Sequence, residues 1–320
     1  MTWRLRAARL TRAQMATILF LAPADLGEAV LASGALAHVA RAGDSVHIAA
    51  TADAAPLFRA VPGAVVLGGD PLLASWLALL RGRPYDLLLD ARGDARTAFA
   101  AARRRCVLAP GAVLRHRVEA WAEAVGADRA LAPALWIDDR ARREADALAR
   151  SGGLMVLAPG GAHESKRWPA ERFAAVARRL ASGPLAGAEI VVLGAAARDR
   201  ALVSSIVSSL DADGVTARDA GEGVDLLAAA ALLERATLCI GNDNALTHIA
   251  AAAGAPTLTL FGPTDERVRA PWGPRTRTLR GRPFHEVAAM PALDAVAAMG
   301  EVSVDAVEAA ALDLLRAGGL

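Results

Sequence analysis

The feature that most constrains the fold of this chain is a regular alternation between short apolar runs and longer alanine-rich stretches. The apolar runs are continuous, without the polar alternate positions expected of a strand that has one solvated face. Such strands, separated by helices, are typical of a parallel sheet that helices cover on both faces. The predicted strands lie at residues 17–22, 45–50, 64–68, 86–90 and 105–109, and then at 154–159, 189–194, 215–220, 237–241 and 256–262.

Helices are expected between these strands, and the pattern occurs twice. In the stretch after residue 169, Phe173, Val176, Ala177 and Leu180 are spaced to form one apolar helical face. A charged segment, DDRARREADALARSGG, ends at a glycine pair and separates the two repeats. We therefore predict an α/β protein with two Rossmann-like domains, residues 1–150 and 151–320, with the option that the final helix packs back on the first. First-half helices are expected near 27–41, 53–60, 71–81, 94–103 and 117–126.

Lysine and asparagine are almost absent from this chain, and the few that occur lie in two separate loops. Lys166 is the only lysine among the 36 Lys and Arg residues, and Asn242 and Asn244 are the only asparagines. Lysine offers a compact ammonium on a flexible stem, which the planar guanidinium of arginine cannot imitate. The alternative is chance survival in a chain of biased composition. The coincidence of both loops favours a shared binding role.

Composition and charge argue against several classes of protein. A net charge of +2 gives no general case for nucleic-acid binding, and no Cys/His cluster has metal-ligand spacing. Cys106 and Cys239 lie in apolar runs, which favours buried reduced thiols over a disulfide. No apolar run reaches the roughly 18 to 20 residues that cross a bilayer, and ATILFLAP resembles a first strand more than a signal peptide. A cytoplasmic protein is expected.

Three loops follow predicted strands and precede predicted helices, where α/β proteins bind ligands. They are LAPADLGEAVLASGAL, LAPGGAHESKRWP and CIGNDNALTHIAAAAGAPT, and none is a Walker or G-x-G-x-x-G sequence. In the second loop, Gly160 and Gly161 allow a close backbone approach to an anion, and Lys166 supplies a charge. The third loop ends at a helix N-terminus, which carries roughly half a positive charge. Together they predict a diphosphate site that needs no metal.

Two long segments resemble a known family. PGGAHESKRWPAERF and GNDNALTHIAAAAGAPTLTLFGPTD are similar to motifs of glycosyltransferase family 9, the ADP-heptose:lipopolysaccharide heptosyltransferases, and weaker similarity runs from about residue 17 to the C-terminus. The resemblance implies a GT-B fold, in which two Rossmann-like domains face each other across a cleft. It also implies inverting, metal-independent transfer of a heptose or related sugar from an ADP-sugar, without a cofactor. The implied acceptor is an anionic, lipid-linked saccharide of the lipopolysaccharide core, reached by peripheral contact with the inner membrane.

Carried over to this chain, the family's donor site falls in the second domain. Lys166 would contact the donor phosphates, Asp243 would hydrogen-bond the donor, and His248 would bind phosphate or shape the loop. Asp199 lies near the place where the family often has an acid for the ribose, although AAARD does not align uniquely. The implied donor-binding residues are Gly160, Gly161, Lys166, Asp199, Asp243, Asn244, Ala245 and His248.

The chain departs from the family's pattern in two places. Where the family has Gly-Asp, with the aspartate as general base, this chain has Gly27 and Glu28. Glutamate has one more methylene, and a displacement of about 1 Å can cost some hundredfold in rate, so Asp25 is a second candidate for the base. Ala245 stands where the family has a glycine and narrows the space beside the donor, so the identity of the donor is not fixed by the resemblance.

Each assignment has a plainer alternative. Lys166 can be a surface lysine, Asp243 a helix cap and His248 a structural histidine. Glu28 can be an acidic residue that is favoured at a helix N-terminus only by the helix dipole. Trp168 is expected to anchor its loop by packing. Arg92, Arg115 and Arg117 are candidates for an anionic acceptor, with solvated surface charge as the default. The alternatives for the whole protein are a family member with another donor or acceptor, a non-catalytic binder of nucleotide sugars, and a nucleotide-sugar epimerase.

Overall fold

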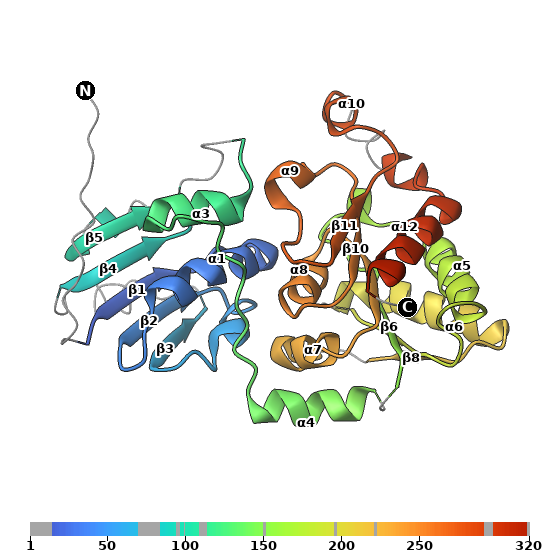
Figure 1. Ribbon diagram of the computed structural model, residues 1–320, viewed down its shortest axis with the longest axis horizontal. Coiled ribbons are helices and arrows are strands. Elements are labelled where there is room, and N and C mark those ends of the chain that lie inside the picture. The colour runs from blue at the N-terminus through green and yellow to red at the C-terminus, as the bar shows by residue number, and fades with distance from the viewer. Residues whose placement is uncertain are drawn as a thin grey trace.

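The computed structural model describes residues 15–69, 84–93, 97–98, 100–108, 114–149, 152–194, 197–220, 223–290 and 297–318. Within these ranges the chain forms two α/β halves, each built on its own sheet (Figure 1). The helix expected at 71–81 lies outside the described residues, as do residues 94–96 and 99 of the one expected at 94–103. None of the described helices is both long and apolar enough to cross a membrane.

The first half is a five-stranded parallel sheet in the order β3-β2-β1-β4-β5. Helix α1 (Leu26–Val39) follows β1, and α3 (Arg117–Val125) ends at Gly126, whose φ of 79° suits glycine. The expected helix at 53–60 is a short 3-10 turn, η1 (Ala55–Phe58). The strands are β1 (Thr17–Leu21), β2 (Ser45–Ala50), β3 (Ala64–Gly68), β4 (Tyr85–Asp90) and β5 (Ala102–Val107).

The second half is a six-stranded parallel sheet in the order β11-β10-β9-β6-β7-β8. All five residues of β6 are buried, as a continuous apolar run on a doubly covered strand requires. The strands are β6 (Leu154–Ala158), β7 (Glu189–Val192), β8 (Ala217–Asp219), β9 (Leu238–Asn242), β10 (Thr257–Leu260) and β11 (Thr276–Leu279).

Helices cover both faces of this second sheet. The predicted apolar face of α5 (Ala170–Ala181) is confirmed, because Phe173, Val176, Ala177 and Leu180 are all fully buried. Cys106 and Cys239 are buried and unpaired, as expected. The other helices are α6 (Arg200–Ala212), α7 (Leu226–Leu233), α8 (Ala245–Ala252), α9 (Glu266–Arg269), α10 (Phe284–Ala288) and α12 (Val304–Ala317), with the short turns η3 (Glu164–Lys166) and η4 (Ala197–Asp199).

The structure corrects three expectations. Strand β11 was missed, because its middle residues are exposed and it shows no apolar run. Strand β5 begins at Ala102, inside the expected helix 94–103, because its exposed arginines conceal a strand at the sheet edge. The final helix, α12, packs against α5, β10 and β11 and therefore covers the second sheet, which rules out the packing on the first domain that we had allowed.

The halves meet through helices at the carboxyl ends of their strands. Helix α1 packs against α8, and η1 packs against α7. The segment that joins the halves carries α4 (Asp139–Leu148), which packs on α7 below the second sheet in Figure 1. In each sheet, successive strands are added first on one side of the starting strand and then on the other. This change of side lies between β1 and β4 in the first sheet and between β6 and β9 in the second. Such switch points are where open α/β sheets bind ligands.

Candidate functional site

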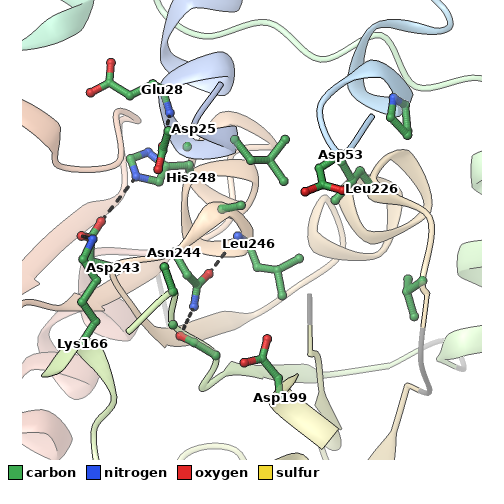
Figure 2. A pocket seen from close by; sticks show the side chains of 18 of the residues that line it. Asp25, Glu28, Asp53, Lys166, Asp199, Leu226, Asp243, Asn244, Leu246 and His248 are labelled. Carbon is green, nitrogen blue, oxygen red and sulfur yellow. Dashed lines mark hydrogen bonds and ion pairs between the residues drawn. The ribbon is translucent and has the colours of Figure 1, made fainter. Parts of the chain in front are cut away.

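A cavity of about 660 Å³ lies where the two halves meet. Its walls come from the loops after β1, β6 and β9, which are the three loops that the sequence singled out, and from residues before α7 and at the end of α9. Figure 2 shows side chains from both halves directed into it. Of the predicted site residues, the cavity is lined by Asp25, Glu28, Gly160, Gly161, Lys166, Asp199, Asp243, Asn244, Ala245 and His248.

The lysine and the carboxylate flanked by asparagines meet in this cavity. Lys166 Nζ lies 2.6 Å from Asp243 Oδ2, although 77 residues separate them in the chain. Lys166 lies at the end of η3 and Asp243 at the carboxyl end of β9, so the β6/β9 switch point brings them together. Their side chains are 19% and 8% exposed, which makes the pair partly shielded from solvent yet open to a ligand.

Asp243 is held as a carboxylate. Burial alone would raise its pKa, but His248 and the ammonium of Lys166 outweigh burial and hold the pKa of Asp243 below its ordinary value. His248 Nε2 lies 3.7 Å from Asp243 Oδ1. The imidazole is 4% exposed, and its Nδ1 has no hydrogen-bond partner among the described residues. The site therefore presents an ion pair beside a buried, unsatisfied ring nitrogen.

The glycine loop after β6 makes room for a third acid. A Cβ on Gly160 would lie 2.6 Å from Asp199 Oδ2, so only glycine allows the Asp199 carboxylate to sit against this backbone. Asp199 is 1% exposed and accepts a hydrogen bond from Arg167 at 3.2 Å. A Cβ on Gly161 would lie 3.2 Å from the Arg167 side chain. The two glycines therefore admit protein side chains, in addition to any ligand.

The two asparagines fasten the glycine loop to the start of α8. Asn244 caps α8 through its amide oxygen, which accepts from Leu246 N and Thr247 N, while its Nδ2 donates to the carbonyls of Ala158 and Gly160 at 2.8 and 2.9 Å. Asn242 Nδ2 donates to Pro159 O at 2.6 Å. Aspartate would retain the cap but lose these donors. The amide contacts thus give a structural reason for an asparagine at each of these two positions.

Glu28 does not lie free in the cavity. Its Oε1 accepts from Arg269 Nε at 2.6 Å, and its Oε2 lies 3.2 Å from Arg117 Nε. Arg117 begins α3 in the first half, and Arg269 ends α9 in the second, so Glu28 joins the two halves. The Glu28 side chain is 10% exposed. Asp25, by contrast, is exposed at the N-cap of α1, where its Oδ1 accepts from Glu28 N at 2.9 Å.

His248 and the first half are in direct contact through Gly27. A Cβ on Gly27 would lie 2.8 Å from His248 Cδ2 and 3.0 Å from its Nε2. The ring therefore packs on the N-terminal turn of α1, as Figure 2 shows. This contact explains a glycine at position 27 without reference to a ligand: any larger residue would separate α1 from α8.

The other candidate arginines have protein partners. Arg92 donates to Ala22 O at 2.6 Å and to Ala49 O at 3.3 Å, which ties together the carboxyl ends of β1 and β2. Arg115 pairs with Glu123 on the surface of α3. Neither lines the cavity. Trp168 is fully buried and donates from Nε1 to Val302 O at 2.9 Å, so it anchors its loop as expected.

Sequence reasoning missed a second ionic link between the halves. Arg59, which follows η1, donates to Asp138 at 2.8 Å and also pairs with Asp225. Asp138 caps α4 and Asp225 caps α7, and Asp225 lines the cavity. An N-cap aspartate before a helix is readable from sequence, but its arginine partner, 166 residues away from Asp225, is not. Arg269 was missed for the same reason.

The Arg59 link predicts a dependence of stability on pH. Hydrogen bonds from Arg59 and from Ala141 N lower the pKa of Asp138 from 3.8 to about 2. Because the folded-state pKa is depressed, the stabilisation is present above the ordinary pKa and is lost as the pH falls through about 2. Arg59→Gln should lower the melting temperature at pH 5, and the difference from the wild type should shrink towards pH 3. A constant difference across this range would contradict the assignment.

Comparison with known proteins agrees with this architecture. The chain is 33% identical over 184 residues to the lipopolysaccharide heptosyltransferase 3 of Escherichia coli, and the match covers 53% of this chain and 52% of that protein. The chain thus matches only about half the length of this curated relative. Among solved structures, a glycosyl transferase family 9 protein from Veillonella parvula superposes with a TM-score of 0.77 at 19% identity, over 97% of this chain and 100% of that one.

A heptosyltransferase from Escherichia coli solved with ADP superposes with a TM-score of 0.68 at 18% identity, over 93% of this chain and 99% of that chain. These likenesses confirm the GT-B fold, in which two Rossmann-like domains face each other across a cleft. The family described as glycosyltransferase family 9 (heptosyltransferase) matches residues 91–289, which include the loops after β6 and β9. The chain therefore belongs to glycosyltransferase family 9.

Proposed function

We propose that this protein transfers a sugar, a heptose or a close relative, from an ADP-sugar to an anionic saccharide acceptor. The observation that carries the proposal is the convergence of Lys166 and Asp243, 2.6 Å apart, in a cavity between two Rossmann-like halves. A cationic group beside a helix N-terminus at the carboxyl edge of a parallel sheet is an arrangement suited to phosphate.

The donor would lie against the second half. The diphosphate would contact Lys166 Nζ and the backbone at Asn244 and Ala245, where α8 begins and its dipole favours negative charge. His248 lines the cavity beside Asp243 and would shape the phosphate-binding loop, and Asp199 faces the same cavity as a partner for ribose hydroxyls. The similarity to a heptosyltransferase solved with ADP supports adenosine as the nucleoside.

The acceptor would approach from the first half. Arg117 and Arg269 bring two guanidinium groups to the Glu28 edge of the cavity, a net positive group suited to an anionic saccharide. The name of the curated relative, a lipopolysaccharide heptosyltransferase, supports an acceptor of the lipopolysaccharide core. A lipid-linked acceptor would bring the protein to the membrane surface, as a peripheral protein.

The reaction would be a single in-line displacement at the anomeric carbon. A carboxylate of the first half, Glu28 or Asp25, takes the proton of the acceptor hydroxyl as its oxygen attacks. Lys166 and the N-terminus of α8 stabilise the charge that develops on the departing diphosphate. The configuration at the anomeric carbon inverts because there is one displacement, and the scheme requires neither metal nor cofactor. Closure of the two halves would exclude water from the donor.

Calorimetric titration with ADP, UDP, GDP and AMP tests the donor class. We expect ADP to bind more tightly than UDP or GDP, because a structurally similar heptosyltransferase was solved with ADP, and more tightly than AMP, which lacks the second phosphate. Heptose transfer to lipopolysaccharide core then distinguishes an enzyme from a non-catalytic binder. Failure of all four nucleotides to bind at millimolar concentration would remove the basis of the proposal.

A further inference from the structure

Two carboxylates at the start of α1, Asp25 and Glu28, are candidates for the general base, and their environments differ. Glu28 is almost buried and both of its oxygens face guanidinium groups, of Arg269 at 2.6 Å and of Arg117 at 3.2 Å. An acceptor hydroxyl would have to displace one of these arginines before it reached Glu28. In Figure 2 the Glu28 carboxylate also points away from the His248 ring and from Asp243.

Asp25 has the opposite environment. It is exposed on the cavity wall. One oxygen, Oδ1, accepts a hydrogen bond from the backbone N–H of Glu28, which fixes the orientation of the carboxylate. Within the part of the chain that the structure describes, Oδ2 has no hydrogen-bond donor. Asp25 therefore offers an oriented carboxylate with one oxygen free to receive a proton.

Asp25 is also placed next to the donor side of the site. Asp25 and His248 both lie close to Gly27: a Cβ added to Gly27 would be 3.3 Å from Asp25 Oδ1 and 3.0 Å from His248 Nε2. The two residues are therefore near neighbours. His248 Nε2 in turn lies 3.7 Å from Asp243 Oδ1, and Asp243 pairs with Lys166. A row of side chains thus leads from Asp25 to the ammonium, and a sugar bound between them would have a carboxylate on one side and the phosphate site on the other.

We propose that Asp25 is the general base of the transfer and that Glu28 is a positioning residue. The proton of the acceptor hydroxyl passes to Asp25 Oδ2 while the acceptor oxygen bonds to the anomeric carbon. The bond between that carbon and the diphosphate oxygen breaks, and the nucleoside diphosphate leaves with the electron pair beside Lys166. Asp25 then releases its proton to solvent at the exposed cavity wall. Glu28 holds Arg117 and Arg269 together across the cleft, where they meet the anionic acceptor.

This inference rests on the proposed function, and its test keeps the two apart. The measurement is ADP release from ADP-heptose with deacylated lipopolysaccharide core as acceptor, after ADP binding has been confirmed by calorimetry. Asp25→Ser and Asp25→Gly retain an acceptable helix cap, so the variants should fold and bind ADP. Their kcat should fall by about 10² to 10⁴, the usual contribution of a general base. Absence of wild-type transfer would contradict the proposed function and this assignment together.

A small carboxylate provides a readout that a structural role would not give. Formate should restore part of the turnover of Asp25→Gly, because it fits the space of the missing side chain, and should not affect the wild type. Glu28→Gln should mainly raise KM for the acceptor, should lose less than about tenfold in kcat, and should not respond to formate. If Glu28→Gln instead loses 10² or more in kcat while Asp25→Ser keeps wild-type turnover, Glu28 is the base and the proposal is wrong.

Discussion

Replacement of Lys166 by alanine should weaken ADP binding by about a hundredfold, because loss of one partner of a hydrogen-bonded, desolvated charge pair costs about 2 to 5 kcal/mol. Asp243 makes the loss larger. It is held as a carboxylate, and its Oδ2 lies 2.6 Å from the ammonium. Without Lys166, a bound diphosphate would face this carboxylate with no cation between them. Calorimetric titration of the wild type and the variant with ADP gives the ratio of the two dissociation constants.

The control for Lys166→Ala is Lys166→Met, which keeps the apolar stem and removes the charge. Both variants should bind ADP equally weakly if the ammonium is responsible. Lys166→Arg tests the reason for a lysine: a planar guanidinium does not reproduce the compact ammonium beside Asp243, so affinity should remain well below that of the wild type. Wild-type affinity in Lys166→Met, with an unchanged melting temperature, would show that Lys166 is an ordinary surface residue.

Replacement of Gly27 by alanine should reduce turnover strongly while ADP binding to the second half is largely kept. The added Cβ would lie 2.8 Å from His248 Cδ2, below any ordinary contact, and the ring is buried and cannot turn away freely. Helix α1 must therefore move from α8, which displaces Asp25 and Glu28 relative to the donor. A displacement of about 1 Å can cost some hundredfold in rate. Steady-state kinetics and ADP calorimetry on the same preparation separate the two effects.

Gly300→Ala is the matched control for this experiment. A Cβ at Gly300 would meet nothing within 4 Å, and the backbone there has no positive φ. This variant should keep both turnover and ADP affinity. Equal turnover in Gly27→Ala and the wild type would show that the contact between Gly27 and His248 does not set the geometry of the site.

Much of the fold could be predicted because parallel strands that are buried on both faces appear in the sequence as continuous apolar runs. Strand β6, LMVLA, is buried at every position, and its boundaries were predicted within a residue. The same reasoning failed at the sheet edges. Strands β5 and β11 expose arginines and threonines, so they carry no such run, although each pairs with the strand that precedes it in the chain.

The meeting of the three loops was also predictable, since the carboxyl ends of parallel strands share one edge. The partners of individual side chains were not. Nothing local to Glu28 indicates that an arginine 241 residues away will hold its carboxylate, and nothing local to Asp225 indicates Arg59. The rarity of asparagine was informative because its amide donates hydrogen bonds that an aspartate carboxylate cannot make. Asn244 shows this most clearly, because one amide both caps α8 and donates to the glycine loop.

The most direct test of the account is a crystal structure of the protein with ADP bound. We predict that the diphosphate will lie in the cavity between the halves, within hydrogen-bond distance of Lys166 Nζ and of the backbone N–H of Ala245 at the start of α8. Ordered ADP in another part of the molecule, with the Lys166–Asp243 pair untouched in an empty cavity, would contradict the central claim.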